Sequence, residues 1–197
     1  MLTVKKANKN DLLMISAMDV STEKDNQNQD IQIADSTQAW LNWIENTIVF
    51  KAIDDDRNIV GIIVVLPVNN HGYCIHKLLI SNDSSLKPDE NIATLLLERF
   101  LVKIDKHEDK AYVIVPPNDS TAIERYIKHG FNKQTLHPEY LGENEDHLMM
   151  SRSIKWSDIK TNNVLPLNKI SSSSEATKNI DSNLFLKSMN FNNYRVR

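Results

Sequence analysis

Apolar and polar residues at the start of the chain follow first a strand pattern and then a helical one. Residues 2–7 have the composition of a short strand. Apolar side chains at helical spacing then predict a helix over residues 12–20, with Asn10 or Asp11 as its cap. The Asn-, Gln- and Asp-rich residues 21–34 predict a loop.

A second helix is predicted over residues 35–47, where Asp35 or Ser36 can cap the first turn. Its apolar side carries Trp40, Trp43 and Ile44. Two tryptophans three residues apart lie on one helix face, and such a pair most often packs the helix onto the core. We therefore expect this helix to cover one side of a sheet.

After residue 47 the pattern becomes that of strands. Residues 48–53 and 58–68 are β-branched runs, and the acidic stretch between them has turn chemistry, so they predict an antiparallel hairpin. The dipeptide at 71–72 introduces a third strand over 73–81. Strict alternation along that strand would place Cys74, His76, Leu78 and Ile80 on one face.

The second half of the domain alternates helices and strands. The longest helix is predicted over 88–106, and the buried-looking strand 111–117 follows it as the partner expected in a parallel pair. A helix over 119–130 ends at Gly130, and residues 131–137 and 147–154 add two strands. The predicted order is β-α-α-β-β-β-α-β-α-β-β, an α/β fold with a mixed sheet flanked by helices.

Composition divides the chain into one domain and a tail. A chain of 197 residues is most simply one domain with an appendage, which we place at residues 1–154 and 155–197. The tail is Ser- and Asn-rich, basic and without periodicity, so we expect it to be largely disordered. Within it, only residues 183–191 are apolar enough to dock on a surface.

Charge and cysteine content narrow the classes of function. The formal net charge of −3 gives no reason to expect a nucleic-acid partner. The one cysteine, Cys74, cannot form an internal disulfide, which favours a reducing cytoplasm. The start of the chain lacks the apolar core of a signal peptide, and the longest apolar run, 59–68, is too short to span a bilayer. We expect a soluble cytoplasmic protein with no membrane association.

The stretch NDSTAIERYIKHGF at 118–131 carries a family resemblance. Its Ala-Ile pair, a Tyr four residues past the Ala and a closing Gly-Phe stand at the spacing of the GCN5-related N-acetyltransferase (GNAT) family; in this chain they are Ala122, Ile123, Tyr126, Gly130 and Phe131. Asn118 stands one residue before the place usual in the family. Together with the element order, this stretch makes residues 2–154 resemble a GNAT domain.

The resemblance implies acetyl-CoA as co-substrate. In the family the pantetheine lies between the fourth and fifth strands, and the following long helix offers its N-terminus to the pyrophosphate, as a helix dipole allows. By resemblance the cofactor-binding residues are Leu79, Ile80, Lys87, Asn91, Ile92, Ala93 and Asn118. The family loop reads Arg/Gln-x-x-Gly-x-Gly/Ala, and of the residues in register, Pro88, Asn91 and Ala93, only Ala93 agrees. Asp89 and Glu90 would repel a diphosphate, although they also suit an ordinary helix start.

Two catalytic residues follow from the same resemblance. Tyr126 stands where the family has the acid that protonates the departing thiolate, and a phenol is protonated at neutral pH. His76, on the fourth strand, has the chemistry of a base for the acceptor amine. A half-buried aromatic beside Ile123 and a histidine hydrogen-bonded within the sheet are the alternatives. The family's acceptor groove is lined by the helices before the second strand, so Trp40 and Trp43 could instead shape specificity.

Other chemistries are disfavoured by spacing. Residues two apart on one strand face lie about 6.6–7 Å apart, too far for His76 to activate the Cys74 thiol directly. The six histidines are scattered without ligand spacing, so no metal is expected. We predict acetyl transfer to an unknown small-molecule or peptide amine, and the resemblance is compatible with a homodimer. The alternative is a GNAT-fold binding or regulatory module that has lost acetyl-CoA.

Overall fold

A seven-stranded mixed sheet forms the centre of the molecule. The structure, a computed structural model, describes residues 2–25, 35–68, 72–81, 89–105, 110–140, 142 and 146–152. The strands are β1 (Thr3–Lys6), β2 (Ile48–Ile53), β3 (Ile59–Val68), β4 (Gly72–Ile80), β5 (Lys110–Val115), β6 (Lys133–His137) and β7 (His147–Arg152). Their order across the sheet is β1-β2-β3-β4-β5-β7-β6. Neighbouring strands are antiparallel except for the parallel pair of β4 and β5.

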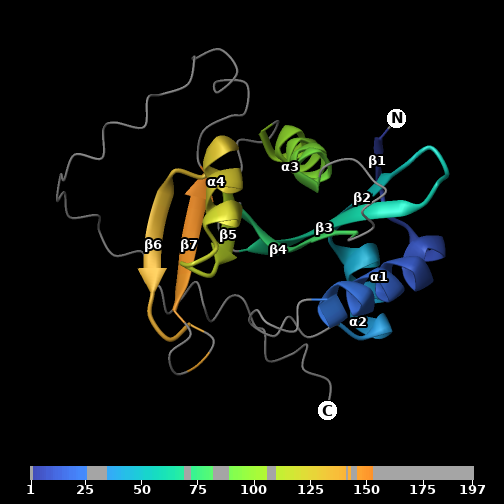
Figure 1. Cartoon of the computed structure of the whole chain (residues 1–197), viewed down its shortest axis with the longest axis horizontal. Coiled ribbons are helices and arrows are strands. Elements are labelled where there is room, and N and C mark those ends of the chain that lie inside the picture. Colours follow the sequence, from blue (N-terminus) through green and yellow to red (C-terminus); the bar gives the residue numbers. More distant parts are fainter. Residues whose placement is uncertain are drawn as a thin grey trace.

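Helices cover both faces of this sheet. They are α1 (Leu12–Asp25), α2 (Thr37–Asn46), α3 (Asp89–Asp105) and α4 (Ser120–Lys128), with a 3-10 turn at Lys9–Asp11. Figure 1 shows α1 and α2 together on one side of the sheet and α3 on the other, with α4 next to β5. The predicted element order and the mixed α/β fold are therefore confirmed, including the parallel pair of β4 and β5. The tail from 155 onward, with its docking segment 183–191, lies outside the described residues.

The first helix begins at Leu12, as predicted, but the residues before it and its end differ from the prediction. Asn10 and Asp11 belong to the 3-10 turn before α1, and Asn8 is the cap of that turn: the Asn10 amide donates to Asn8 Oδ1 (2.9 Å), and the Asn8 amide donates to Asp11 Oδ2 (2.8 Å). The helix also runs to Asp25, into the stretch predicted as loop. Glu23 and Lys24 have good helix propensity, so a helix that tertiary packing has already started can extend through them.

The other local predictions hold. Ser36 caps α2 by accepting from the Ala39 amide (3.1 Å). In the hairpin turn, the Asp54 side chain accepts from the Asn58 amide (2.8 Å). Gly130 follows α4 with φ of 87°, a left-handed conformation that glycine adopts at little cost, as expected for the residue that ends a helix.

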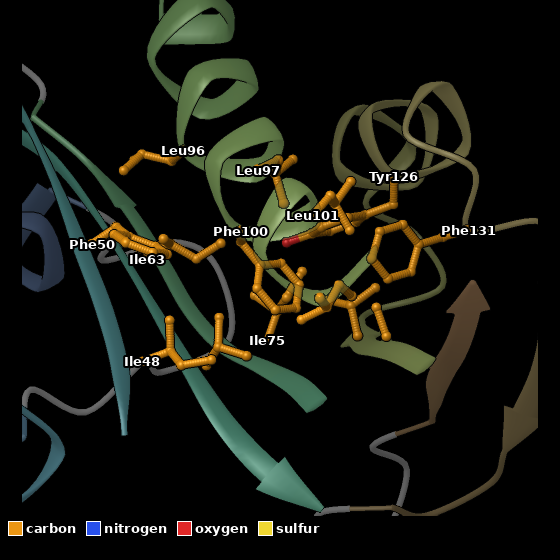
Figure 2. Close-up of a cluster of buried hydrophobic side chains, with 14 of the residues drawn as sticks. Ile48, Phe50, Ile63, Ile75, Leu96, Leu97, Phe100, Leu101, Tyr126 and Phe131 are labelled. Carbon is orange, nitrogen blue, oxygen red and sulfur yellow. The ribbon is translucent and has the colours of Figure 1, made fainter. Parts of the chain in front are cut away.

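Two apolar clusters form the core, one on each face of the sheet. The first, drawn in Figure 2, joins α3 and α4 to the sheet, and Phe100, Tyr126 and Phe131 belong to it. The second places Trp40, Trp43 and Ile44 of α2 against the opposite face, which confirms that these residues pack the helix onto the core. A side chain at Gly61 of β3 would come within 2.5 Å of Ile92 Cγ2 in α3, so the helix lies close against the sheet.

Candidate active site

The strands β4 and β5 pair at one end and separate at the other. Their register joins Gly72–Ile75 to Lys110–Val113, and no later residue of β4 is paired with β5. Beyond this point β4 stays with β3 as far as Ile80, whereas β5 stays with β7 through Val115. The sheet therefore has an opening between the carboxyl-terminal ends of its two parallel strands, which we call the β4–β5 opening.

A β-bulge in β4 stands where the two strands part. Lys77 is paired with Val64 and Ile75 with Val65, so the register of β4 shifts by one residue at His76. A bulge bends its strand and resets the alternation of side chains. The prediction that Cys74, His76, Leu78 and Ile80 share one face is therefore wrong: His76 contacts Trp43 of the second cluster, while Leu78 and Ile80 pack against the first.

The backbone of β4 directs two amides toward the opening. The Ser81 amide donates to the Val60 carbonyl of β3 (3.0 Å). Hydrogen-bonded and non-hydrogen-bonded positions alternate along an antiparallel pair, so Leu79 also bonds to β3. Leu78 and Ile80 then present their N–H groups to the side that faces β5. Of the predicted pair, Ile80 offers its amide to the opening and Leu79 does not, and Leu78 is an amide donor that the sequence did not indicate.

Both helices that follow these strands begin at the same end of the sheet. α3 starts at Asp89 after β4, and α4 starts at Ser120 after β5. The free N–H groups and dipole of a helix N-terminus favour anions. In α4 part of this capacity is already used, because Asp119 Oδ1 accepts from the Ala122 amide (2.9 Å). Asn118 is exposed in the turn just before that cap.

The other predicted cofactor residues lie in the first turns of α3. Ile92 and Ala93 are fully buried, so only their backbone could face a ligand, whereas the side chain of Asn91 is exposed. Lys87 and Pro88 lie outside the described residues, and α3 is described from Asp89 onward. The Ile92 side chain instead serves the contact with Gly61.

His76 lies on the face of the sheet that α1 and α2 cover. Its ring meets that of Trp43 edge-on, with centroids 4.8 Å apart. Burial lowers the pKa of His76 to about 4, an effect that Lys77 strengthens and that Asp35 and Asp19 partly oppose. The imidazole is therefore neutral at pH 7, and the same burial makes it a weaker base than a free histidine.

Tyr126 lies on the opposite face. Its side chain is 5% exposed and meets Phe131 edge-on, with ring centroids 5.5 Å apart. Figure 2 shows it extending from α4 toward α3, with its oxygen near Phe100 and Leu101. Burial raises the pKa of Tyr126 well above its usual 10, so the phenol keeps its proton.

Cys74 is a buried thiol. It is 4% exposed, and burial raises its pKa to about 12, so it carries no thiolate at neutral pH. A Cys74–His76 nucleophile therefore has no support. In the part of the chain that the structure describes, no three His, Cys, Asp or Glu side chains are grouped so that they could hold a metal ion. None of the described helices is long and apolar enough to cross a membrane.

Sequence reasoning missed a buried polar network on the α1–α2 face. Lys77 of β4 donates to both carboxylate oxygens of Asp19 in α1, at 2.9 and 3.0 Å, and is also paired with Asp35. The Trp40 indole N–H donates to Asp19 Oδ2 (2.9 Å). A lysine in the middle of an apolar strand was a signal that some partner is needed, but the partner lies 58 residues away.

Known proteins that resemble this chain were found among solved structures, by their fold. No protein-family model and no curated protein sequence matches this chain. Among solved structures, a ribosomal-protein-alanine N-acetyltransferase from Brucella melitensis matches at 14% identity over 77% of this chain and 99% of its own, with a TM-score of 0.64.

Two further solved structures match over similar lengths. An acetyltransferase of the GNAT family from Staphylococcus aureus Mu50 is 18% identical over 79% of this chain and 100% of its own, with a TM-score of 0.61. An aminoglycoside 6'-acetyltransferase type Ii is 16% identical over 77% of this chain and 96% of its own, with a TM-score of 0.61. At these identities the likeness concerns the fold, and it confirms the resemblance found in the sequence: the chain has the fold of the GNAT acetyltransferases.

Proposed function

We propose that this protein is an N-acetyltransferase that moves the acetyl group of acetyl-CoA directly to a primary amine. The observation that carries the proposal is the β4–β5 opening, where a parallel pair separates beside two helix N-termini. Such an opening leaves strand amides without ladder partners, and these are the groups an extended amide-containing ligand can pair with. Pantetheine is a ligand of that kind.

On the donor side, pantetheine would lie along the open edge of β4. The Leu78 and Ile80 amides would pair with it and polarise the thioester carbonyl, as preorganised donors do. The backbone N-terminus of α3 would meet the pyrophosphate, with Asn91 and Lys87 nearby in the chain. Asn118 would lie at the far wall, at the end of β5.

The two predicted catalytic residues lie on opposite faces of the sheet, which suits a direct transfer. The acceptor would enter on the α1–α2 face, where neutral His76 would take a proton from its amine, directly or through water. The amine nitrogen then bonds to the carbonyl carbon and the carbon–sulfur bond breaks. Tyr126, on the donor face, would give its proton to the thiolate, whose basicity the same apolar surroundings raise.

A non-catalytic module is the second candidate, and the start of α3 favours it. No glycine stands near this turn, and Asp89 and Glu90 add two negative charges where a pyrophosphate would bind. Each such charge costs about 1 kcal/mol near a protein surface. This fold could then serve as a binding or regulatory unit that has lost acetyl-CoA.

Isothermal titration with acetyl-CoA separates the two candidates. We expect saturable binding, and acetyl-CoA at about 100 times its dissociation constant should stabilise the fold by about 2.7 kcal/mol. No heat and no thermal shift at millimolar acetyl-CoA would contradict the enzyme. Replacing Asp89 and Glu90 by Gly should tighten binding if this turn meets the pyrophosphate, whereas unchanged affinity would place the pyrophosphate elsewhere.

The role of Tyr126 is tested by Tyr126→Phe. The variant should bind acetyl-CoA with unchanged affinity and lose turnover by about tenfold or more, since general acid catalysis contributes at least that much. Tyr73→Phe is the matched control, because Tyr73 also packs against the first apolar cluster. Equal turnover of the two variants would remove Tyr126 from the mechanism.

A further inference from the structure

Lys77 is a buried charge beside the residue that we propose as the base. It follows His76 in β4 and is 6% exposed. Its ammonium reaches α1 through two hydrogen bonds to Asp19, at 2.9 and 3.0 Å, and it also pairs with Asp35, just before α2. The side chain thus ties β4 to both helices on that face.

Both carboxylate oxygens of Asp19 accept hydrogen bonds. Its Oδ2 accepts from the Trp40 indole (2.9 Å) and from the Asp35 backbone amide (2.8 Å), in addition to Lys77. Asp19 is 3% exposed, so these bonds replace water almost completely. The network therefore fixes the start of α2, and with it Trp43, relative to the bulge in β4.

A buried ion pair of this kind is weak evidence for stability, since well-packed apolar residues often serve as well. Because the Lys77 ion pair lies next to the bulge in β4, it can have a role other than stability. A bulge leaves one residue outside the strand ladder, and a bulge that can slide would turn His76 to the other face. Lys77 is the first residue after His76 that pairs with β3 again, opposite Val64.

We propose that Lys77 is a positioning residue: by binding Asp19 and Asp35 it holds the β4 bulge against α1 and α2, so that His76 faces the acceptor side of the β4–β5 opening. The chemical use of that position rests on the proposed acetyl transfer, whereas the tether itself does not. The charged groups around His76 are Lys77 on its own strand, Asp19 on α1 and Asp35 before α2, and the Trp43 ring covers it.

The test removes the tether with a double substitution that leaves the net charge of Lys77, Asp19 and Asp35 unchanged. Lys77→Met alone would leave the buried Asp19 and the partly exposed Asp35 without their cation and could unfold the chain. Lys77→Met combined with Asp19→Asn keeps the net charge of the three side chains at −1 while removing the tether. Lys77→Arg keeps the cation. Lys51→Met with Asp11→Asn is the control, because Lys51 of β2 likewise forms an ion pair with a carboxylate before or in a helix, that of Asp11 in the 3-10 turn.

The first readout is the titration of His76 by NMR in the full chain. In the wild type its midpoint should lie near 4. In the tether variant it should rise by about 1 unit or more, because His76 leaves Trp43 for water. Charge alone would change it less, since losing Lys77 raises the pKa of His76 and losing Asp19 lowers it. Lys77→Arg and the Lys51 control should keep the wild-type midpoint.

The second readout is amide hydrogen exchange across residues 75–79. Loss of the tether should speed exchange there by about tenfold, while exchange in β1 and β2 stays unchanged. If the midpoint of His76 and these amides change no more than in the Lys51 control, the proposal is wrong. If both change as expected, the tether is established whether or not acetyl-CoA binds.

The third readout is acetyl-transfer activity, which tests whether the tether matters for catalysis. If the wild type transfers acetyl groups, the tether variant should keep its affinity for acetyl-CoA while kcat falls by about tenfold, because only the placement of the base is lost. An unchanged kcat with a displaced His76 would overturn the link between the tether and catalysis. A chain that does not bind acetyl-CoA would instead refute the proposed function.

Discussion

The two faces of the sheet are built from different chemistry. On the α3–α4 face the buried cluster consists of apolar and aromatic side chains, and these fill the space between helix and strands. On the α1–α2 face the apolar cluster surrounds a buried network of Asp19, Lys77 and Trp40, with His76 next to it. Under the proposed function, the first face would hold the pantetheine side of the reaction and the second the acceptor amine.

Under the proposed function the two faces would carry different tasks. Desolvation acts on both proposed catalytic groups but in opposite senses: it keeps a proton on Tyr126 and keeps one off His76. Burial is thus the main cause that fixes the protonation states of both groups at neutral pH, on opposite faces of the sheet. The contrast predicts that the two faces respond differently to mutation and to pH.

The largest effect is expected on the apolar face. Phe100 is fully buried in α3, so Phe100→Ala should lower the free energy of unfolding by about 4 kcal/mol, through lost burial and the cavity left behind. Urea denaturation measures this. Val102→Ala, on the exposed side of the same helix, should change it by no more than about 0.5 kcal/mol. Equal effects would mean that α3 does not pack as described.

The next largest loss of stability is expected at the ion pair that joins β7 to the end of α3. Arg152, the last residue of β7, donates to Asp105 Oδ1 and Oδ2 at 2.6 and 2.9 Å and is 2% exposed. Arg152→Met should destabilise the fold by about 3 kcal/mol, because the largely buried Asp105 carboxylate loses its cation. Thermal unfolding measures it, and adding Asp105→Asn should recover part of the loss. No recovery would show that Arg152 acts by packing alone.

On the α1–α2 face, His76 should make the stability of the fold depend on pH. His76 has a pKa near 4 in the folded chain and about 6.5 when unfolded, so below pH 6.5 the unfolded state binds a proton that the folded state refuses. Lowering the pH from 7 to 5 should therefore decrease the free energy of unfolding by about 2 kcal/mol. His76→Gln should remove that part of the loss in urea titrations at the two pH values. An equally steep loss in the variant would contradict the burial of a neutral His76.

The smallest effect concerns the helix that carries Trp43. Ser36→Ala removes the cap of α2 and should cost about 1 kcal/mol, whereas the exposed Gln38→Ala should have almost no effect. Chemical denaturation measures both. A loss at Ser36 accompanied by a higher pKa of His76 would show that the placement of α2 helps to bury the base. No loss at Ser36 would mean that packing alone holds the first turn.

Local patterns predicted the elements well because they depend on neighbours in the chain. The hairpin around Asp54, the Ser36 cap and the left-handed Gly130 follow from turn and cap chemistry within a few residues. The parallel pair followed from a helix between two apolar strands. Even here Asn8, the cap of the 3-10 turn before the first helix, was missed, because Asn10 and Asp11 have the same cap chemistry two and three residues later.

The details of the site depend on contacts that the sequence does not state. One extra residue in β4 moved His76 and Leu78 to opposite faces, and no pattern within the strand marks where a bulge falls. The partner of Lys77 is chosen by how α1 packs on β4, across 58 residues. Chemistry-bearing residues could thus be named in advance, while their faces and partners could not.

The most direct test of the account is to map acetyl-CoA onto the backbone by NMR. We predict that adding acetyl-CoA shifts the amide signals of Leu78 and Ile80, which face the β4–β5 opening, and slows their exchange. The amides of β1 and of Ala52 in β2, at the other end of the sheet, should stay unchanged. No shift at Leu78 and Ile80 with millimolar acetyl-CoA, or shifts confined to another part of the sheet, would contradict it.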